Sequence, residues 1–230
     1  MMDCDFLKAK SEEIRKKVIQ YHSQTKTGHI GSDLSSVEIM TSLHYNILHE
    51  EDRFILSKGH ASGILYVILN DMGKIPDEQL NHLEEHPTIN KKYGICATTG
   101  SLGQGLSLGL GMALANPKSK IYILMGDGEC DEGQVWEAAR TASDFKINNL
   151  ITIVDCNGFQ GFKDTNHFNL DKRFESFGWE VRRCEGHNLS ELSKTITAHS
   201  KSPLVVLANT IKGKGLPHLE NQLKSHYAYQ

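Results

Sequence analysis

A carboxylate and an amide stand at the ends of two short apolar runs in this chain. Asp127 follows the run 121–125 within a Gly-Asp-Gly turn, and Asn157 follows the run 150–155. Their oxygens are hard ligands of the kind that Mg²⁺ prefers, and the neighbouring glycines allow a diphosphate to approach the backbone. The residues therefore indicate a site for a divalent cation carrying a diphosphate, although each motif alone would be interpreted as an ordinary turn.

The two runs must be placed side by side for this chemistry. Both are short, rich in β-branched residues and bounded by turn residues, as is typical of buried parallel strands. Residues 131–145 between them have the length and spacing of a crossover helix. Such a unit brings Asp127 and Asn157 together at the carboxyl edge of a sheet, where open α/β sheets bind ligands.

The rest of the chain alternates between helical and strand patterns. Helices are expected over residues 5–23, 35–48, 61–72, 102–115 and 189–198 and after Pro76, and strands over 54–56, 179–184 and 204–208. Ser35 or Ser36 is the expected N-cap of the second helix. The glycines of residues 102–115 weaken a helix, which indicates close packing against another backbone, with a subunit interface as one candidate. The alternation predicts an α/β fold with a doubly wound parallel sheet flanked by helices, in a single domain spanning residues 1–230.

Composition excludes several classes of protein. Lys and Arg number 25 against 28 Asp and Glu, so neither nucleic acid nor an anionic membrane is an expected partner. No apolar run approaches the roughly 20 residues of a membrane helix, and the first residues lack the apolar core of a secretory signal. Five cysteines without CxxC spacing fit reduced thiols in a cytoplasmic protein. Cys130 and Cys156, beside the expected site, are interpreted as small buried hydrophobic residues.

Two of the 12 histidines have an informative position. His29 and His60 each follow a glycine in a loop between expected elements, and such loops carry binding groups at the edge of an α/β sheet. Imidazoles move protons at neutral pH and donate hydrogen bonds to developing oxyanions. Eight other histidines, His22, His44 and His187 among them, are interpreted as surface or core residues.

These motifs and several others follow one another in an order that resembles the amino-terminal half of transketolase, a thiamine diphosphate enzyme. The resemblance covers almost the whole chain and predicts the thiamine diphosphate-binding fold, specifically its diphosphate-binding domain. The matching segments are Gly28-His29-Ile30-Gly31, Leu56-Ser57-Lys58-Gly59-His60-Ala61, His86-Pro87, residues 98–105, the segment from Gly126 to Asn157, and Ile211-Lys212-Gly213-Lys214-Gly215 with His226 beyond it.

The resemblance implies thiamine diphosphate held by Mg²⁺ (or Ca²⁺ or Mn²⁺), with roles for residues that match the family pattern. The implied metal ligands are Asp127, Asn157 and the carbonyl of Phe159. The implied cofactor-binding residues are His60, Gly100, Leu102, Gly128, Glu132, Asn157 and His226. The implied catalytic residues are His29, His60, His86, His226 and Glu132, the last within a carboxylate network across a dimer interface.

The implied reaction moves a two-carbon ketol unit from a ketose to an aldose acceptor. The family's glutamate that promotes deprotonation of the cofactor lies in a pyrimidine-binding domain, which this chain lacks, as it lacks a C-terminal domain. We therefore expect the amino-terminal subunit of a split transketolase, active only with a separate C-terminal subunit in an α₂β₂ assembly. A truncated fragment is the other interpretation. Phosphorylated or nucleotide-linked sugars are the expected substrates.

Four residues depart from the family pattern. Glu85 replaces a glycine before His86, Thr88 an acidic residue, Cys156 an asparagine, and Tyr227 the glycine after His226. They leave the cofactor site intact but bear on acceptor specificity, so an enzyme of a specialised sugar pathway is an open alternative.

Three other functions compete with this interpretation. A deoxyxylulose-phosphate synthase fits the segment 56–60 less well. A dinucleotide-binding oxidoreductase would use the weak Gly103-Gln104-Gly105 motif, with Asp127 as its ribose-binding acid, but leaves Asn157 and the histidine loops unexplained. A non-catalytic interaction subunit would have no need of the metal ligands.

Overall fold

Five parallel strands form one sheet in the computed structural model, which describes residues 3–165 and 169–228. The strands are β1 (Arg53–Leu56), β2 (Ile121–Gly126), β3 (Leu150–Cys156), β4 (Glu180–Glu185) and β5 (Leu204–Asn209). Their order across the sheet is β1-β2-β3-β5-β4, and every neighbouring pair is parallel. The carboxyl ends of all five strands therefore meet at one edge.

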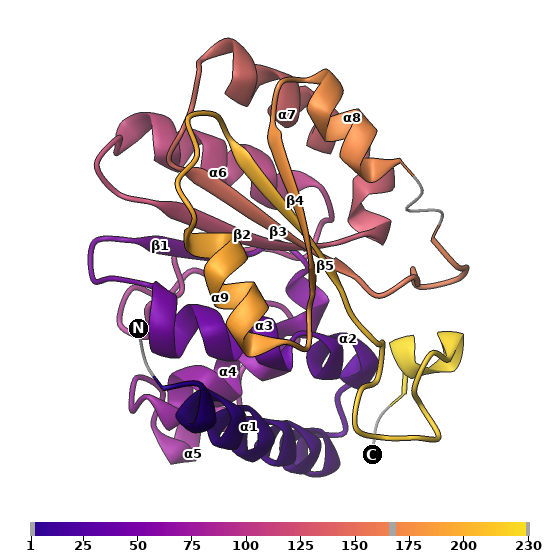
Figure 1. Ribbon diagram of the computed structural model, residues 1–230. Coiled ribbons are helices and arrows are strands. Elements are labelled where there is room, and N and C mark those ends of the chain that lie inside the picture. Colours follow the sequence, from indigo (N-terminus) through magenta and orange to yellow (C-terminus); the bar gives the residue numbers. More distant parts are fainter. Residues whose placement is uncertain (1–2, 166–168, 229–230) are drawn as a thin grey trace.

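Helices cover both faces of this sheet (Figure 1). One face carries α6 (Gln104–Ala115), α7 (Gly133–Asp144) and α8 (Leu170–Ser176). The other carries α1 (Cys4–Thr25), α2 (Ile30–Ser35), α3 (Val37–Ser42), α4 (Ser62–Asp71) and α9 (Leu189–Thr197), while the short α5 (Asp77–Leu80) follows α4. The predicted doubly wound α/β architecture is confirmed.

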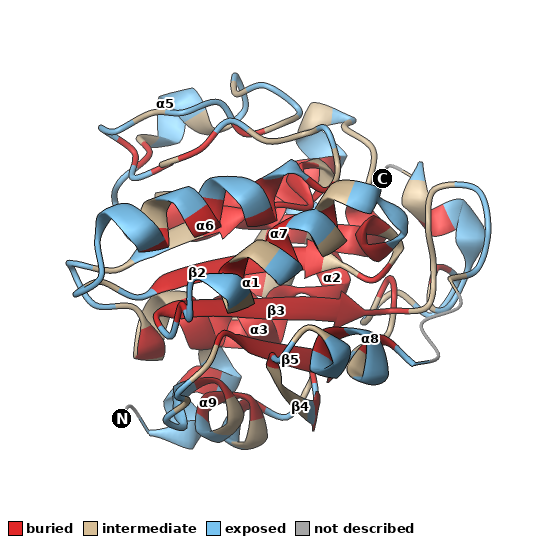
Figure 2. Ribbon diagram, turned by 90° about the horizontal axis from the view of Figure 1, so that it is seen from above, coloured by how far each residue is buried: buried red, intermediate tan, exposed pale blue. Residues whose placement is uncertain are grey.

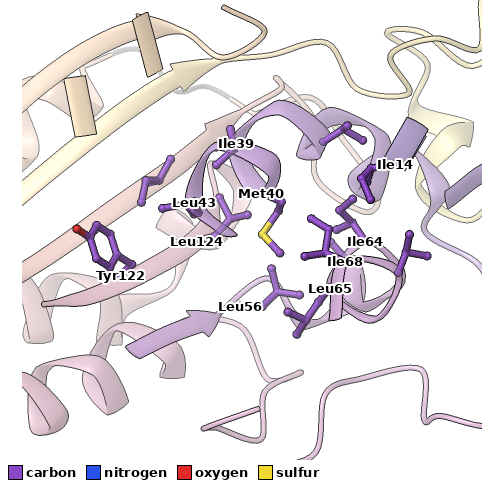
Figure 3. Close-up of a cluster of buried hydrophobic side chains, with 14 of the residues drawn as sticks. Ile14, Ile39, Met40, Leu43, Leu56, Ile64, Leu65, Ile68, Tyr122 and Leu124 are labelled. Atoms are coloured by element: carbon purple, nitrogen blue, oxygen red, sulfur yellow. The ribbon is translucent and has the colours of Figure 1, made fainter. Parts of the chain in front are cut away.

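Each layer of helices has its own hydrophobic core against the sheet. Every residue of β3 is buried, and Figure 2 shows this strand enclosed along its length. The core beneath the sheet joins Ile14 of α1 and Ile64 of α4 to Leu124 of β2 (Figure 3). β-branched and aliphatic residues at successive positions explain why β2, β3 and β5 are buried on both faces.

The region of residues 35–48 departs from expectation. It was predicted as one helix, but α2 ends at Ser35, α3 begins at Val37, and residues Leu43–Ile47 form a π-helical turn. Ser36 occupies the N-cap position of α3, one of the two predicted, but it makes no side-chain capping hydrogen bond. Its hydroxyl donates to the carbonyl of Ser32 (2.9 Å), and the Ser35 hydroxyl donates to Asp155 (2.6 Å). The chain bends at Ser36 because these hydroxyls bond buried groups in place of the helix terminus.

The glycines of α6 have two different surroundings. A Cβ atom on Gly105 would lie 2.1 Å from Ser57 Oγ, and one on Gly109 would lie 2.3 Å from Ile123 Cδ1. The expected close packing is therefore packing of α6 against the sheet. Gly111 faces open space, so only this glycine is left for the proposed subunit interface.

Two expectations from composition concern membranes and thiols. Among the described residues, none of the helices has the length and apolarity needed to cross a membrane. All five cysteines lie in the described ranges and are free thiols. Cys130 and Cys156 are buried, as expected of small hydrophobic residues, and burial raises the pKa of both thiols well above the usual value.

Candidate functional site

The ends of β2 and β3 are joined directly by hydrogen bonds. The Asp127 amide donates to the carbonyl of Asp155 (3.2 Å), and the Gly158 amide donates to Asp127 Oδ2 (2.8 Å). Asp127 and Asn157 line a shared cavity of about 460 Å³, together with Gly128 and Phe159. The predicted placement of Asp127 and Asn157 together at the carboxyl edge of the sheet is thus confirmed.

The side-chain oxygens at this edge are held in fixed orientations. Asp127 Oδ1 accepts from the Gly128 amide (2.9 Å), and Oδ2 accepts from the Thr165 hydroxyl (2.7 Å). Asn157 Oδ1 accepts from the Phe159 amide (3.1 Å), and its Nδ2 donates to Asp155 (3.0 Å). Carboxylate and amide oxygens have further lone pairs, so the set fits a hard divalent cation.

Four histidines from distant parts of the chain form a cluster beside this cavity. His29 begins α2, His60 lies in the turn after β1, His86 precedes α6, and His226 lies near the C-terminus. The His29 ring centroid is 5.2 Å from that of His60, 6.5 Å from His86 and 4.9 Å from His226. His60 and His226 also line the cavity, so the cluster and the metal-ligand candidates belong to one site.

His29, His60 and His226 favour the neutral imidazole. Burial, followed by the charge of Lys212, lowers the pKa of His226 to about 3. Burial lowers the pKa of His60 well below its usual value, and the nearby Lys58 acts in the same direction. Burial also lowers the pKa of His29, although Glu85 opposes this shift. A neutral imidazole offers one donor and one acceptor, which suits proton transfer to and from hydroxyl groups.

A buried ion pair between Lys58 and Asp155 lies next to Asn157. Lys58 Nζ donates to Asp155 Oδ2 (2.5 Å), and Asp155 also accepts from Ser35, Thr210 and Asn157. Burial raises the pKa of Asp155, but Lys58 and the hydrogen bonds outweigh burial and hold that pKa below its usual value. The charged carboxylate therefore fixes the orientation of the Asn157 amide.

Lys212 is a second cation buried at the same place. Its ammonium lies 3.0 Å from His226 Nδ1, and burial together with the charge of Lys58 lowers the pKa of Lys212 to about 8. The charge of Lys58 is paired with Asp155, so Lys212 is the cation that adds a positive charge close to the cavity, which suits a diphosphate.

The turn after β2 is tied to the start of α6 by a buried carboxylate. Glu129 accepts from the Gly103 amide (2.8 Å), from the Gly126 amide (3.3 Å) and from the Ser57 hydroxyl. Burial raises the pKa of Glu129, while these hydrogen bonds lower it. This contact holds Leu102, which lines the cavity, next to the turn that carries Asp127 and Gly128.

Gly100 and Glu132 are the remaining predicted site residues, and only Glu132 lines the cavity. A Cβ atom on Gly100 would lie 3.1 Å from the His86 ring, so this glycine permits close approach of the two loops. Glu132 is exposed at the rim of the cavity, immediately before α7. The Gly103-Gln104-Gly105 motif follows no strand within the described residues 96–102, contrary to a dinucleotide-binding fingerprint.

Sequence reasoning missed the supporting residues Lys58, Asp155, Lys212 and Glu129. Asp155 could have been found, because residues two apart on a strand face the same side and Asn157 follows it by two. Glu129 lies in a 3₁₀ turn and could not have been assigned from periodicity. His22 and His187 have the expected structural contacts, to Asp33 (2.5 Å) and Glu38 (2.7 Å).

Comparison with known proteins identifies the family. The family model described as transketolase, thiamine diphosphate binding domain, matches residues 8–229. An apulose-4-phosphate transketolase subunit of Actinobacillus succinogenes is 40% identical, over 97% of this chain and 91% of that protein. The 6-deoxy-6-sulfo-D-fructose transketolase subunit SqwG of a Clostridium species is 36% identical, over 96% of this chain and 90% of that protein.

The fold agrees with a solved transketolase. The crystal structure of the Campylobacter jejuni enzyme superposes with a TM-score of 0.89 at 30% sequence identity, covering 99% of this chain and 41% of that one. The chain thus spans less than half of that transketolase, but nearly all of the two subunit relatives. From its sequence and its fold alike, this chain belongs to the transketolase family and corresponds to the thiamine diphosphate-binding domain.

Proposed function

We propose that this chain binds thiamine diphosphate and a divalent cation as the amino-terminal subunit of a two-chain transketolase. The observation that carries the proposal is the cavity at the carboxyl edge of the sheet, which Asp127 and Asn157 share with His60 and His226. In this proposal residues 1–230 act as one diphosphate-binding domain. A separate chain would supply the pyrimidine-binding domain, in a cytoplasmic α₂β₂ assembly.

The residues of the cavity fit these ligands. Asp127, Asn157 and the carbonyl of Phe159 would coordinate Mg²⁺, because all three present hard oxygen atoms. Lys212 would offset part of the charge of the diphosphate. The Gly128 amide, which donates to Asp127 in this structure, would be shared with a diphosphate oxygen.

Gly100, Leu102 and Glu132 would complete the binding of the cofactor. Leu102 lies at the wall of the cavity and Gly100 beside His86, so both suit contacts with the rings of the cofactor. The exposed carboxylate of Glu132 is available to a carboxylate network with another subunit. That role depends on an assembly beyond the single chain.

Thiamine diphosphate, when bound, supplies a carbanion for addition to a ketose carbonyl and an electron sink for cleavage of the adjacent carbon–carbon bond. His29, His60, His86 and His226 would hold and move protons at the hydroxyl and carbonyl oxygens of the sugars.

The names of two relatives support a class of substrate. One relative is named for apulose 4-phosphate and the other for 6-deoxy-6-sulfo-D-fructose. Both names describe a sugar with an anionic group at its far end. We therefore favour a ketose or aldose with a phosphate or sulfonate remote from the reacting carbonyl over a nucleotide-linked sugar.

Native mass spectrometry of the protein, isolated from its own cells by a tag on this chain, tests the proposal. A complex with a partner of about two further domains, roughly 300 residues, carrying thiamine diphosphate and magnesium is expected. The complex should transfer a two-carbon unit, and the chain alone should not. Homo-oligomers without cofactor would contradict the proposal, and turnover by the pure chain would contradict the requirement for a partner.

A further inference from the structure

A carboxylate lies at the edge of the histidine cluster, at Glu85, one of the positions that depart from the family pattern. Glu85 Oε1 is 3.6 Å from His29 Nε2, and the Glu85 side chain is 52% exposed. Its backbone is anchored to α4, because the Ser62 hydroxyl donates to the Glu85 carbonyl (2.5 Å) and the Tyr66 hydroxyl donates to that of Glu84 (3.0 Å). The carboxylate is thus held beside His29 while it faces open space.

An exposed aromatic ring lies on another side of His29. The Tyr227 ring centroid is 5.6 Å from that of His29 and 4.8 Å from that of His226, and the residue is 64% exposed. A Cβ atom on Gly28 would lie 3.9 Å from both Glu85 Oε1 and the Tyr227 carbonyl. Glu85 and Tyr227 therefore approach one another across the Gly28–His29 turn.

From this arrangement we infer that Glu85 is a specificity-determining residue, which accepts a hydrogen bond from a substrate hydroxyl beside His29 and excludes an anionic substituent there. The inference rests on the proposed function and narrows its substrate class. The part of the sugar next to the reacting carbonyl must be uncharged and hydroxylated. The anionic group of a phosphorylated or sulfonated sugar must then lie farther away.

The charges around His29 support this selectivity. Glu85 and Asp33 are the anionic groups that act on His29, whereas His60, His86 and His226 are its imidazole neighbours and Tyr227 its phenol. The pKa values of His60 and His226 are lowered, so these rings carry no positive charge at neutral pH. Neither ring therefore offsets the repulsion between Glu85 and a carboxylate on the substrate. The nearest cation, Lys212, contacts His226 (3.0 Å) and is not among the charges that act on His29.

Two small acceptor aldehydes that differ in charge test the inference. Glycolaldehyde carries a hydroxyl group on the carbon next to its carbonyl, and glyoxylate carries a carboxylate there. The donor in each reaction is D-xylulose 5-phosphate. Its two-carbon ketol unit forms a bond to the aldehyde carbon of the acceptor, and the rest of the donor leaves as an aldose phosphate. The kcat/KM values of both aldehydes are measured for the complex containing wild-type chain, Glu85→Gln or Glu84→Gln.

Glu85→Gln should raise the ratio of kcat/KM for glyoxylate to that for glycolaldehyde by about tenfold, the size of one Coulomb repulsion at a partly exposed site. High salt should shrink this gain, because salt screens the repulsion in the wild-type protein. Glu84→Gln removes the neighbouring exposed carboxylate and should leave the ratio unchanged. An equal change for both aldehydes, or an equal effect of Glu84→Gln, would overturn the inference.

Ring signals of His29 in the isolated chain, followed by NMR, provide a readout independent of turnover. Added glyoxylate should perturb these signals at lower concentration in Glu85→Gln than in wild type, with glycolaldehyde as the uncharged comparison. If this difference is present but the wild-type complex transfers no ketol unit, the proposed function fails, and only the exclusion of an anion by Glu85 is retained. If the complex is active and neither readout discriminates between the aldehydes, the inference fails alone.

Discussion

Asp127 is the residue on which the proposed metal site depends most. It is 4% exposed, and its carboxylate is held by the Gly158 amide and the Thr165 hydroxyl at the wall of the cavity. In a site for a hard cation with one carboxylate and one amide ligand, the carboxylate is the only charged ligand side chain. Binding of the cation, and through it of the diphosphate, should therefore respond sharply to this side chain.

Replacing Asp127 by alanine or asparagine should weaken Mg²⁺-dependent binding of thiamine diphosphate by at least about 100-fold, because the carboxylate ligand is lost. Isothermal titration of the complex with its partner measures the effect. Asp131→Asn is the matched control: this carboxylate also lines the cavity, but it is exposed and accepts from the Gln160 amide. Cofactor affinity that is unchanged in both Asp127 variants would rule out the metal assignment.

Asp155 should matter for stability as well as for the site. Asp155→Ala leaves the Lys58 ammonium buried without its carboxylate, and breaking such a pair costs about 3–5 kcal/mol. Urea denaturation of the isolated chain measures this loss. Asp144→Asn breaks the exposed pair with Arg140 and should leave the free energy of unfolding nearly unchanged. A loss as small in Asp155→Ala as in the control would show that the buried pair contributes little.

At the scale of elements, the junction between α6 and the sheet is the contact most sensitive to size. Gly105 lies against Ser57, whose hydroxyl bonds Glu129, while Gly111 on the same helix faces open space. The two glycines thus form a natural pair of variants.

Gly105→Ala should destabilise the chain by about 1–3 kcal/mol, because the added methyl group overlaps the Ser57 side chain and its Cα atom. Gly111→Ala should instead be neutral or stabilising by up to about 1 kcal/mol, since alanine favours the helix. Urea denaturation of both variants gives the comparison. Equal effects at the two positions would mean that α6 is not packed as closely as described.

The sequence predicted the strands better than the helical region before β1. β2 and β3 are apolar runs with turns at both ends, so their pattern depends on local sequence alone. The break at Ser36 was missed because it depends on hydrogen bonds to Ser32 and to Asp155, which lies about 120 positions away. The short α8 was not predicted at all.

The site residues, too, were predicted where the local sequence marks them and missed where only a distant contact reveals them. Asp127, Asn157 and the histidines were found because motifs and resemblance mark them in the sequence. Lys58 was quoted within a motif but given no role, since only its 2.5 Å contact with Asp155 reveals one. The roles of the eleven proposed site residues in binding and catalysis remain predictions, and the Asp127 variants test the metal ligand among them.

At the scale of the whole molecule, buried histidines should make the fold sensitive to acid. Burial lowers the pKa of His44 to about 3, and burial lowers those of His60 and His226 as well. In the unfolded chain these groups take up protons near pH 6.5. Their contribution to stability is therefore present above pH 6.5 and is lost as the pH falls.

His44→Phe should flatten this pH dependence. Between about pH 6 and 4, one proton fewer is taken up on unfolding, so the slope should fall by about 1.4 kcal/mol per pH unit. His44 packs edge-on against Phe54, and its Nε2 has no hydrogen-bond partner among the described residues, so phenylalanine suits the position. Urea denaturation across this range measures the slope. A slope equal to that of wild type would mean that His44 is protonated in the folded chain.

His22 acts in the opposite sense. Burial opposes its protonated form, but Asp33 outweighs burial and raises the pKa of His22. Its contribution is complete below pH 6.5 and is lost as the pH rises through the folded pKa, so it does not contribute to the acid slope. The buried neutral histidines lower the stability below pH 6.5, and His22 contributes less as the pH rises above it. The free energy of unfolding should therefore be greatest near neutral pH.

The histidine cluster joins the first and last parts of the chain, and this has a consequence for synthesis. His29 leaves the ribosome about 200 residues before His226, which at about 5–20 residues per second is a delay of roughly 10–40 seconds. The strands and the Asp127 turn emerge within that interval and are free to fold. A nascent chain therefore passes through a period in which the carboxyl edge with Asp127 can already form, before His226 has emerged to complete the histidine cluster.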